Sequence, residues 1–239
     1  MNVMSPAIHS PAIHSLAGER FVFGSSGEVL GHDLTAMPAW EEFRGFWNDL
    51  EIDRYMNDGG TYRFRRFGRF KWFADGSRLE LQPHGPYSQP PYLNPLNGGM
   101  DRHFAPLTPE IASNQVLRRL LLTLGETYAG IEDVLMWKIN VYLNRIVARG
   151  AEPGLPVPEG MHRDGVRFGC LLVAGRDNVE GGVTTLYGLD KEPLVTTTLA
   201  RTGDCMLFRD DVVFHDTTPV AAVDPGREGH RDLLVVEFR

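Results

Sequence analysis

The spacing of apolar residues divides the chain into a first half with helical periodicity and a second half of short strands. Apolar residues recur every three to four positions over residues 40–55 and again over residues 111–124. This is the spacing of an amphipathic helix. Thr35 and the pair Thr108-Pro109 precede these runs and are residue types that begin helices. We therefore predict two helices, each packed with one face against a core.

From about residue 132, the pattern changes to short segments rich in β-branched and aromatic residues, separated by Gly, Pro and Asp. Such segments are typical of strands. We predict strands near residues 133–147, 166–173, 183–188, 193–199, 205–208, 212–215 and 231–238. Because no helical segments separate them, the pattern favours an antiparallel barrel or a double-sheet jelly roll over a βαβ fold.

Two further segments of the first half carry distinct patterns. In residues 62–72, basic and aromatic residues nearly alternate, as in an amphipathic strand. A surface that stacks nucleic-acid bases is the less favoured interpretation of this run. Residues 83–99 are rich in Pro and Gly and are long for a loop, which indicates a lid or a binding segment.

These patterns predict one domain of α+β class, mainly β, over residues 19–239. Residues 19–131 supply packing helices and the mouth of a substrate site, and residues 132–239 form a double-stranded β-helix core (jelly roll, cupin-like). Residues 1–18 contain a tandem repeat of Ser-Pro-Ala-Ile-His. Because two such copies are too few to build a repeat fold, we expect a flexible leader and no metal site at His9 and His14.

The composition narrows the class of protein. The 239 residues are 42% hydrophobic and 23% charged, as in a soluble globular domain, and the formal net charge of −7 argues against a nucleic-acid partner. We find no secretory signal and no segment of membrane-spanning length. Cys170 and Cys205 lie in apolar stretches and predict buried free thiols in a reducing compartment. We expect a cytoplasmic protein without a membrane partner, and the oligomeric state stays open.

The chemistry concentrates in one ordered set of residues. His162 and Asp164 are two positions apart in an extended segment, so both side chains project from the same face. Alone, such a pair is weak evidence for a metal site. His215 ends a later predicted strand and completes a set of two histidines and one carboxylate, which suits non-haem Fe(II). Zinc is the alternative, although structural zinc sites usually include cysteine.

Arg231 opens the last predicted strand and supplies a guanidinium group that could bind a carboxylate bidentately. The competing interpretation is an exposed arginine paired with Asp232 or Glu237. The order of His162, Asp164, His215 and Arg231 favours the first interpretation.

Several motifs in the same order resemble the bacterial Fe(II)/2-oxoglutarate-dependent dioxygenases that hydroxylate free L-amino acids, typified by the L-isoleucine hydroxylases. The motifs are Pro158–Gly165 (PEGMHRDG), Gly175-Arg176-Asp177-Asn178 with Gly181-Gly182, Asp210-Asp211 ahead of Phe214-His215, and Arg231–Val235. Residues 137–146 and 82–104 are also similar to that family. The resemblance covers most of the second half.

The resemblance implies that His162, Asp164 and His215 ligate Fe(II) and that Arg231 binds the distal carboxylate of 2-oxoglutarate. The implied reaction uses O2, hydroxylates an unactivated C–H bond of a free L-amino acid or close derivative, and releases succinate and CO2. By the same resemblance, Tyr142 and Arg145 lie at pocket positions.

An amino-acid substrate needs a cation for its carboxylate and an acceptor for its ammonium group. Arg145, Arg163 and Arg176 are candidates for the first role, and Glu159 is the candidate for the second. Two alternatives stay open: the same chemistry on a larger natural-product or peptide-bound substrate, and a non-catalytic jelly-roll binding protein.

Overall fold

The computed structural model describes residues 11–75, 78–94 and 96–239. Its largest element is an eight-stranded antiparallel sheet. The strands of this sheet are β1 (Phe21–Ser25), β2 (Glu51–Ile52), β3 (Arg63–Phe73), β4 (Arg78–Leu81), β5 (Met136–Ala148), β6 (Phe168–Asp177), β10 (Asp204–Phe208) and β13 (Gly229–Phe238). They are ordered β1-β10-β6-β13-β5-β3-β2, with β4 paired to β3.

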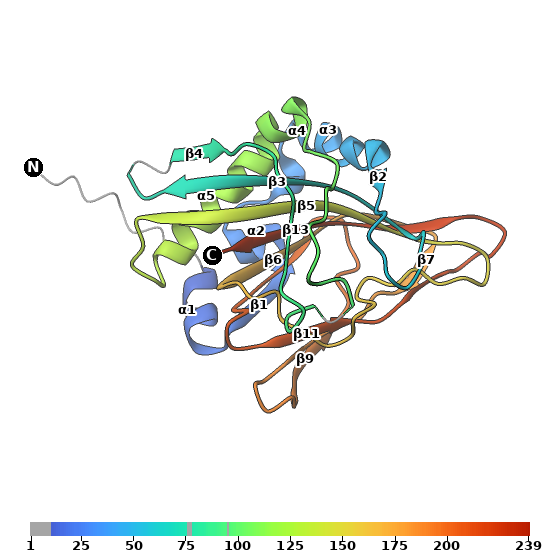
Figure 1. Cartoon of the computed structure of the whole chain (residues 1–239). Coiled ribbons are helices and arrows are strands. Elements are labelled where there is room, and N and C mark those ends of the chain that lie inside the picture. Colours follow the sequence, from blue (N-terminus) through green and yellow to red (C-terminus); the bar gives the residue numbers. More distant parts are fainter. Residues whose placement is uncertain (1–10, 76–77, 95) are drawn as a thin grey trace, which may run out of the picture.

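Smaller sheets face this one and close the second layer. Their strands are β7 (Val179–Gly181), β8 (Thr184–Tyr187), β9 (Pro193–Thr197), β11 (Phe214–Thr217) and β12 (Val220–Ala222). The strands pair as β11-β8-β9 and as β12-β7, and in Figure 1 β9 and β11 lie below the large sheet. The predicted α+β, mainly β fold with a double-stranded β-helix core is confirmed.

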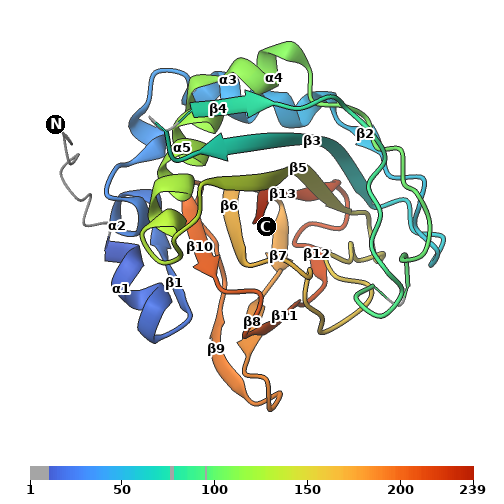
Figure 2. The same cartoon turned by 60° about the vertical axis from the view of Figure 1, so that its left-hand side comes forward.

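Helices cover the other face of the large sheet (Figure 2). They are α1 (Pro11–Gly18), α2 (Ser26–Leu30), α3 (Trp40–Gly45), α4 (Pro109–Ser113) and α5 (Gln115–Ala129), with 3-10 turns η1 (Leu34–Ala36) and η2 (Phe46–Asp49). Strand β6 is buried on both faces: Cys170 and Leu172 belong to the core under the helices, whereas Leu171 and Val173 belong to the core between the sheets. The alternation of side chains along a strand thus builds two cores.

The two predicted packing helices are each interrupted. The first is predicted to start after Thr35, but α3 begins at Trp40, and Thr35 lies in η1, which is capped by Asp33. Its helical turns end before β2, so the predicted stripe does not extend to residue 55. The second is confirmed at Thr108, whose side chain accepts a hydrogen bond from the Ile111 backbone N–H. It restarts at Asn114, which caps α5.

The first half contributes more to the β core than the sequence predicts. The basic and aromatic run forms β3, as predicted, and β3 pairs with β5 along its length. Strand β1 pairs with β10. The β core therefore includes strands from outside residues 132–239.

The structure also differs from the predicted flexible leader. Residues 11–18 form α1, in which Ala12 and Leu16 are fully buried and His14 is exposed. Burial of these two apolar side chains ties α1 to the core. The rest of the predicted leader, with His9, lies outside the described residues. Within the described part of the chain, no helix combines the length and apolar character needed to span a membrane.

Candidate metal centre

His162, Asp164 and His215 lie together and offer ligand atoms that are all within 4.8 Å of one another. His162 Nε2 is 3.4 Å from Asp164 Oδ1, and His215 Nε2 is 3.6 Å from Asp164 Oδ2. We call these three residues the triad. Two imidazoles and one carboxylate that converge in this way could hold one divalent cation, and they suit non-haem iron.

The backbone fixes the triad directly. His162 and His215 exchange two backbone hydrogen bonds, of 3.0 Å from His162 N to His215 O and 2.9 Å in return. The His162 Nδ1 atom lies 2.9 Å from the Gly160 carbonyl oxygen. Protonation of Nδ1 lets it donate to this carbonyl and leaves Nε2 as the ligand atom.

A buried carboxylate, Asp210, supports the loop that carries Asp164. Its oxygens accept hydrogen bonds from the backbone N–H groups of Asp164, Gly165 and Val166, at 2.9, 2.8 and 3.0 Å. Burial, with the nearby Asp164 carboxylate, raises the pKa of Asp210 to about 7. The sequence indicated Asp210 as part of a motif but gave it no role.

The two histidines of the triad have opposite pKa shifts. Burial disfavours the charged form of His162, but the hydrogen bond and charge of Asp164, together with Glu159, outweigh this and raise its pKa to about 9. Burial and the neighbouring His162 lower the pKa of His215 to about 4. Because a metal binds neutral imidazole, a divalent cation at the triad would compete with protons for His162.

Arg231 is 1% exposed, and its Nε and Nη2 atoms have no hydrogen-bond partner among the described residues. Burial, with the neighbouring Arg176, lowers the pKa of Arg231 to about 10. The acids proposed as its partners bind elsewhere: Asp232 pairs with Arg145, and Glu237 accepts from Asn140. Burial of a guanidinium group without a partner reduces the stability of the folded protein. The surroundings of Arg231 therefore fit an anionic ligand that would pair with it.

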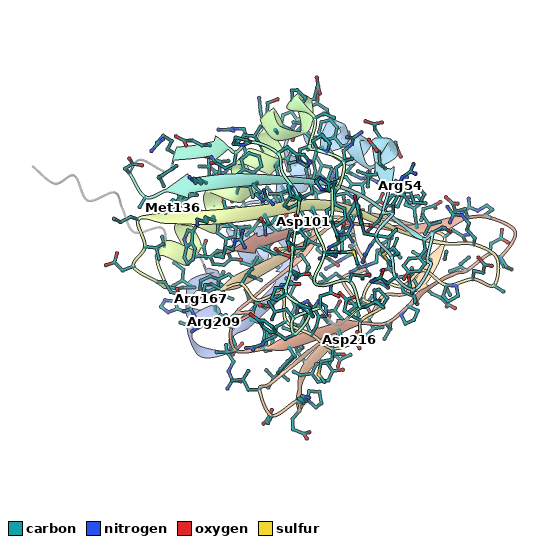
Figure 3. The ribbon with its side chains drawn as sticks, in the orientation of Figure 1. Arg54, Asp101, Met136, Arg167, Arg209 and Asp216 are labelled. Atoms are coloured by element: carbon teal, nitrogen blue, oxygen red, sulfur yellow. The ribbon has the colours of Figure 1, made fainter. Side chains whose placement is uncertain are left out.

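The triad and Arg231 line one cavity of about 130 Å³. Residues of β11 and of the segment between β4 and α4 line this cavity. Asp216 of β11 and Asp101 of that segment are labelled in Figure 3. The segment includes Gln89, Asn94 and Arg102, which also line the cavity. Residues 83–99, predicted as a lid or a binding segment, therefore contribute Gln89 and Asn94 to the cavity lining.

Comparison with models of known protein families identifies the family of this chain. The model of the 2OG-Fe dioxygenase family matches residues 44–237. The chain belongs to the 2OG-Fe dioxygenase family. It is therefore an oxidoreductase that uses Fe(II), 2-oxoglutarate and O2, which argues against the alternative of a non-catalytic binding protein. The donor set of the triad fits the iron of this family.

Solved structures agree with this membership. A bsmA homolog from Methylobium petroleophilum PM1 is 34% identical, with a TM-score of 0.86 over 96% of this chain and 92% of that one. IDO from Bacillus thuringiensis is 18% identical, with a TM-score of 0.79 over 100% and 98% of the two chains. The Fe(II)/α-ketoglutarate-dependent dioxygenase TqaL is 19% identical, with a TM-score of 0.74 over 100% and 91%. The last two share the fold. The curated proteins contain no match.

In this dioxygenase, two of the five residues predicted to bind substrate line the cavity. The Tyr142 hydroxyl donates to Glu237 Oε2 at 3.1 Å. Glu159 Oε1 lies 4.0 Å from His162 Nε2 and accepts a hydrogen bond from Asn94. The Glu159 Oε2 atom is buried and has no hydrogen-bond partner among the described residues.

The other three predicted residues lie outside this cavity. Three residues of β5 line the cavity: Tyr142, Asn144 and Ile146. Because side chains alternate along a strand, Arg145 projects to the opposite face, where it pairs with Asp232 at 2.7 Å. Arg163 lies between two triad residues and also points away, over the ring of Phe214. Arg176 donates to the Gly181 carbonyl at 2.9 Å.

Gln89, Asn94 and Arg102 line the cavity from residues 82–104, the segment that the resemblance places at the mouth of the substrate site. Sequence reasoning gave no cavity role to three further polar residues, Arg63, Arg65 and Glu237. The alternation along β3 carried a signal for two of them, because Arg63 and Arg65 are two positions apart and share a face. Which face points inward depends on the pairing of β3 with β5, which the sequence does not reveal.

Proposed function

We propose that this dioxygenase hydroxylates an unactivated C–H bond of a free L-amino acid or close derivative, with Fe(II) on His162, Asp164 and His215 and with 2-oxoglutarate on Arg231. The observation that carries the proposal is the shared cavity of the triad and the unpaired, buried guanidinium of Arg231. A keto-diacid has one end for the metal and a second carboxylate for such an arginine.

In this proposal, the chain supplies position and electrostatics. Iron and 2-oxoglutarate together supply the oxidising chemistry with O2, and they yield succinate and CO2. His162, Asp164 and His215 would hold the metal, and a set of three protein ligands would leave positions for the cosubstrate and O2. Arg231 orients the cosubstrate, and the cavity walls hold the target C–H bond in place while they exclude water.

The proposed substrate class rests on the motif resemblance to L-amino acid hydroxylases and on the charged groups of the cavity. Buried arginines and the carboxylate of Glu159 line the same space, which suits a small zwitterion. The alternative keeps the chemistry and changes the substrate to a larger natural product or a peptide-bound residue.

The metal assignment is tested by optical spectroscopy. Under anaerobic conditions, Fe(II) and 2-oxoglutarate together should produce a metal-to-ligand charge-transfer band in the wild-type enzyme. His162→Ala and His215→Ala should abolish the band, whereas His103→Ala, at an exposed position, should keep it. Absence of the band from iron-loaded wild type would refute the assignment.

The substrate class is tested by succinate formation against a panel of free L-amino acids, with mass spectrometry to detect an added oxygen atom. Stimulation by free amino acids supports the proposal. A response only to peptides or larger metabolites would show that the free-amino-acid assignment is wrong.

We also propose a cytoplasmic location. Cys170 and Cys205 are both buried free thiols, and both thiols and Fe(II) persist best under reducing conditions. Cell fractionation with antibody detection tests this, and recovery of the protein from an oxidising compartment would contradict it.

A further inference from the structure

Three buried arginines form one wall of the cavity. Arg63 and Arg65 come from β3, and Arg102 comes from the segment between β4 and α4, where its backbone pairs with that of Tyr87. Arg102 is 2% exposed, and the other two are also buried. We call these three residues the arginine wall. Arg231 is not part of it.

The arginine wall is only partly neutralised within the protein. Asp53 Oδ2 accepts a hydrogen bond from Arg63 Nε at 2.9 Å and lies 3.1 Å from Arg65 Nε. Arg102 is held by a neutral partner, since its Nη2 atom donates to Gln89 Oε1 at 2.9 Å. The Asp53 carboxylate thus contacts two of the three guanidinium groups.

Donor groups of the wall also lack partners. The Nε atoms of Arg65 and Arg102 are buried and have no hydrogen-bond partner among the described residues. Asp53 Oδ2 lies 3.1 Å from Arg65 Nε, but the angle is unsuitable for a hydrogen bond. Both guanidinium groups rest on aromatic rings, with Arg65 4.7 Å from the Phe104 centroid and Arg102 4.9 Å from that of Tyr87. The rings hold the cations rigidly in place but do not neutralise them.

The repulsion within the wall also appears in the pKa of Arg65. Burial, followed by the charge of Arg63, lowers this pKa to about 9, with Arg102 contributing in the same direction. Arg65 stays protonated at neutral pH. An anion bound between these side chains would relieve the repulsion and satisfy the free donors.

Glu159, the nearby carboxylate of the cavity, is separated from the arginine wall by two amide side chains. Asn94 Nδ2 lies 3.1 Å from Glu159 Oε1 and 3.3 Å from Gln89 Oε1, and Gln89 in turn contacts Arg102. Two neutral amides therefore stand between the carboxylate and the guanidinium. This leaves an anion site and a cation site side by side, with Glu159 next to the triad.

We propose that the arginine wall binds the α-carboxylate of the substrate and that Glu159 accepts its ammonium group. This inference rests on the proposed function and narrows it to substrates with a free carboxylate. An internal residue of a peptide has no such group, and neither do amino-acid amides. The wall replaces Arg145, Arg163 and Arg176 as the cation for the substrate.

The test uses anaerobic enzyme loaded with Fe(II) and 2-oxoglutarate. The probes are the free L-amino acids, their primary amides and the corresponding decarboxylated amines, and the readouts are the shift of the charge-transfer band and calorimetric binding. At least one free acid should bind, and its amide and amine should bind about tenfold more weakly or worse. Arg65→Gln and Arg102→Gln should weaken binding of the acid by about tenfold or more, with the band retained.

Arg66→Gln is the matched control, because Arg66 directly follows Arg65, lies on the opposite face of β3 and pairs with Asp49. Arg102→Lys keeps the positive charge, so this variant should bind the free acid more tightly than Arg102→Gln does. Thermal melting checks that each variant is folded. Equal binding of acid and amide, unchanged affinity in both Gln variants, or no binding by any free acid would overturn the inference. A missing band in wild type would instead refute the proposed function.

Discussion

Asp210 Oδ1 lies 3.7 Å from His215 Nδ1, and the same oxygen accepts the backbone N–H of Asp164. One buried carboxylate therefore contacts two parts of the triad that are far apart in the sequence. Its second oxygen accepts the N–H groups of Gly165 and Val166. Asp210 holds the Asp164 loop by hydrogen bonds and lies next to the His215 ring.

We predict that Asp210→Asn weakens metal binding by about 10- to 100-fold. The Asn side chain has nearly the same shape, but its amide NH2 would face backbone N–H groups that need an acceptor. Titration of Fe(II) into the apoenzyme measures the change. Asp211→Asn is the control, because Asp211 pairs with Arg209 away from the triad. Equal affinities for both variants would contradict the role of Asp210.

Arg231→Lys should weaken 2-oxoglutarate binding by about tenfold or more, because an ammonium group cannot form the paired bonds of guanidinium with a carboxylate. The dissociation constant is measured by anaerobic titration of the charge-transfer band. Arg145→Lys serves as the control: Arg145 pairs with Asp232 outside the cavity, so its change should affect stability and not the affinity for 2-oxoglutarate. Unchanged affinity in Arg231→Lys would remove this residue from its proposed role.

The triad was predictable because its evidence is local. His162 and Asp164 share a face through the alternation of an extended segment, and His215 lies at a strand predicted from β-rich sequence. The arginine wall was not predictable in the same way. Arg65 pairs with Asn144 in the sheet, and this register turns Arg65 inward, whereas no local signal distinguishes it from Arg66.

The fold shows the same limit. The predicted strands of the second half all appear, since their β-branched and aromatic residues and the Gly, Pro and Asp between them are local signals. Strand β1 was missed because five residues next to a polar turn carry little periodicity, and its place beside β10 is set by long-range pairing. Helix α1 was missed because its Pro- and Ser-containing repeat is typical of coil, although Leu16 is buried in the core.

Leu16→Ala should therefore destabilise the protein by about 2–5 kcal/mol, which is the usual cost of truncating a buried leucine. A loose leader would give no such effect. Leu189→Ala is the matched control, since Leu189 is 58% exposed, and it should change stability by less than about 0.5 kcal/mol. Urea denaturation measures both values. Equal, small effects of the two substitutions would mean that α1 does not contribute to the core.

Glu237 gives the stability a predictable pH dependence. Burial, with the Asp164 carboxylate, raises its pKa from 4.5 to about 8. Because the folded protein binds this proton more tightly than the unfolded chain, stability is highest below the unfolded pKa and falls as pH rises toward the folded one, by up to about 1.4 kcal/mol per pH unit. Glu237→Gln removes this dependence and keeps an acceptor for Asn140.

Urea denaturation of the apoenzyme between about pH 5 and pH 8 measures the effect. As the pH rises, the free energy of unfolding of Glu237→Gln should increase relative to that of wild type. Glu180→Gln, at an exposed position, should follow wild type, and a pH-independent difference for Glu237→Gln would contradict a protonated Glu237.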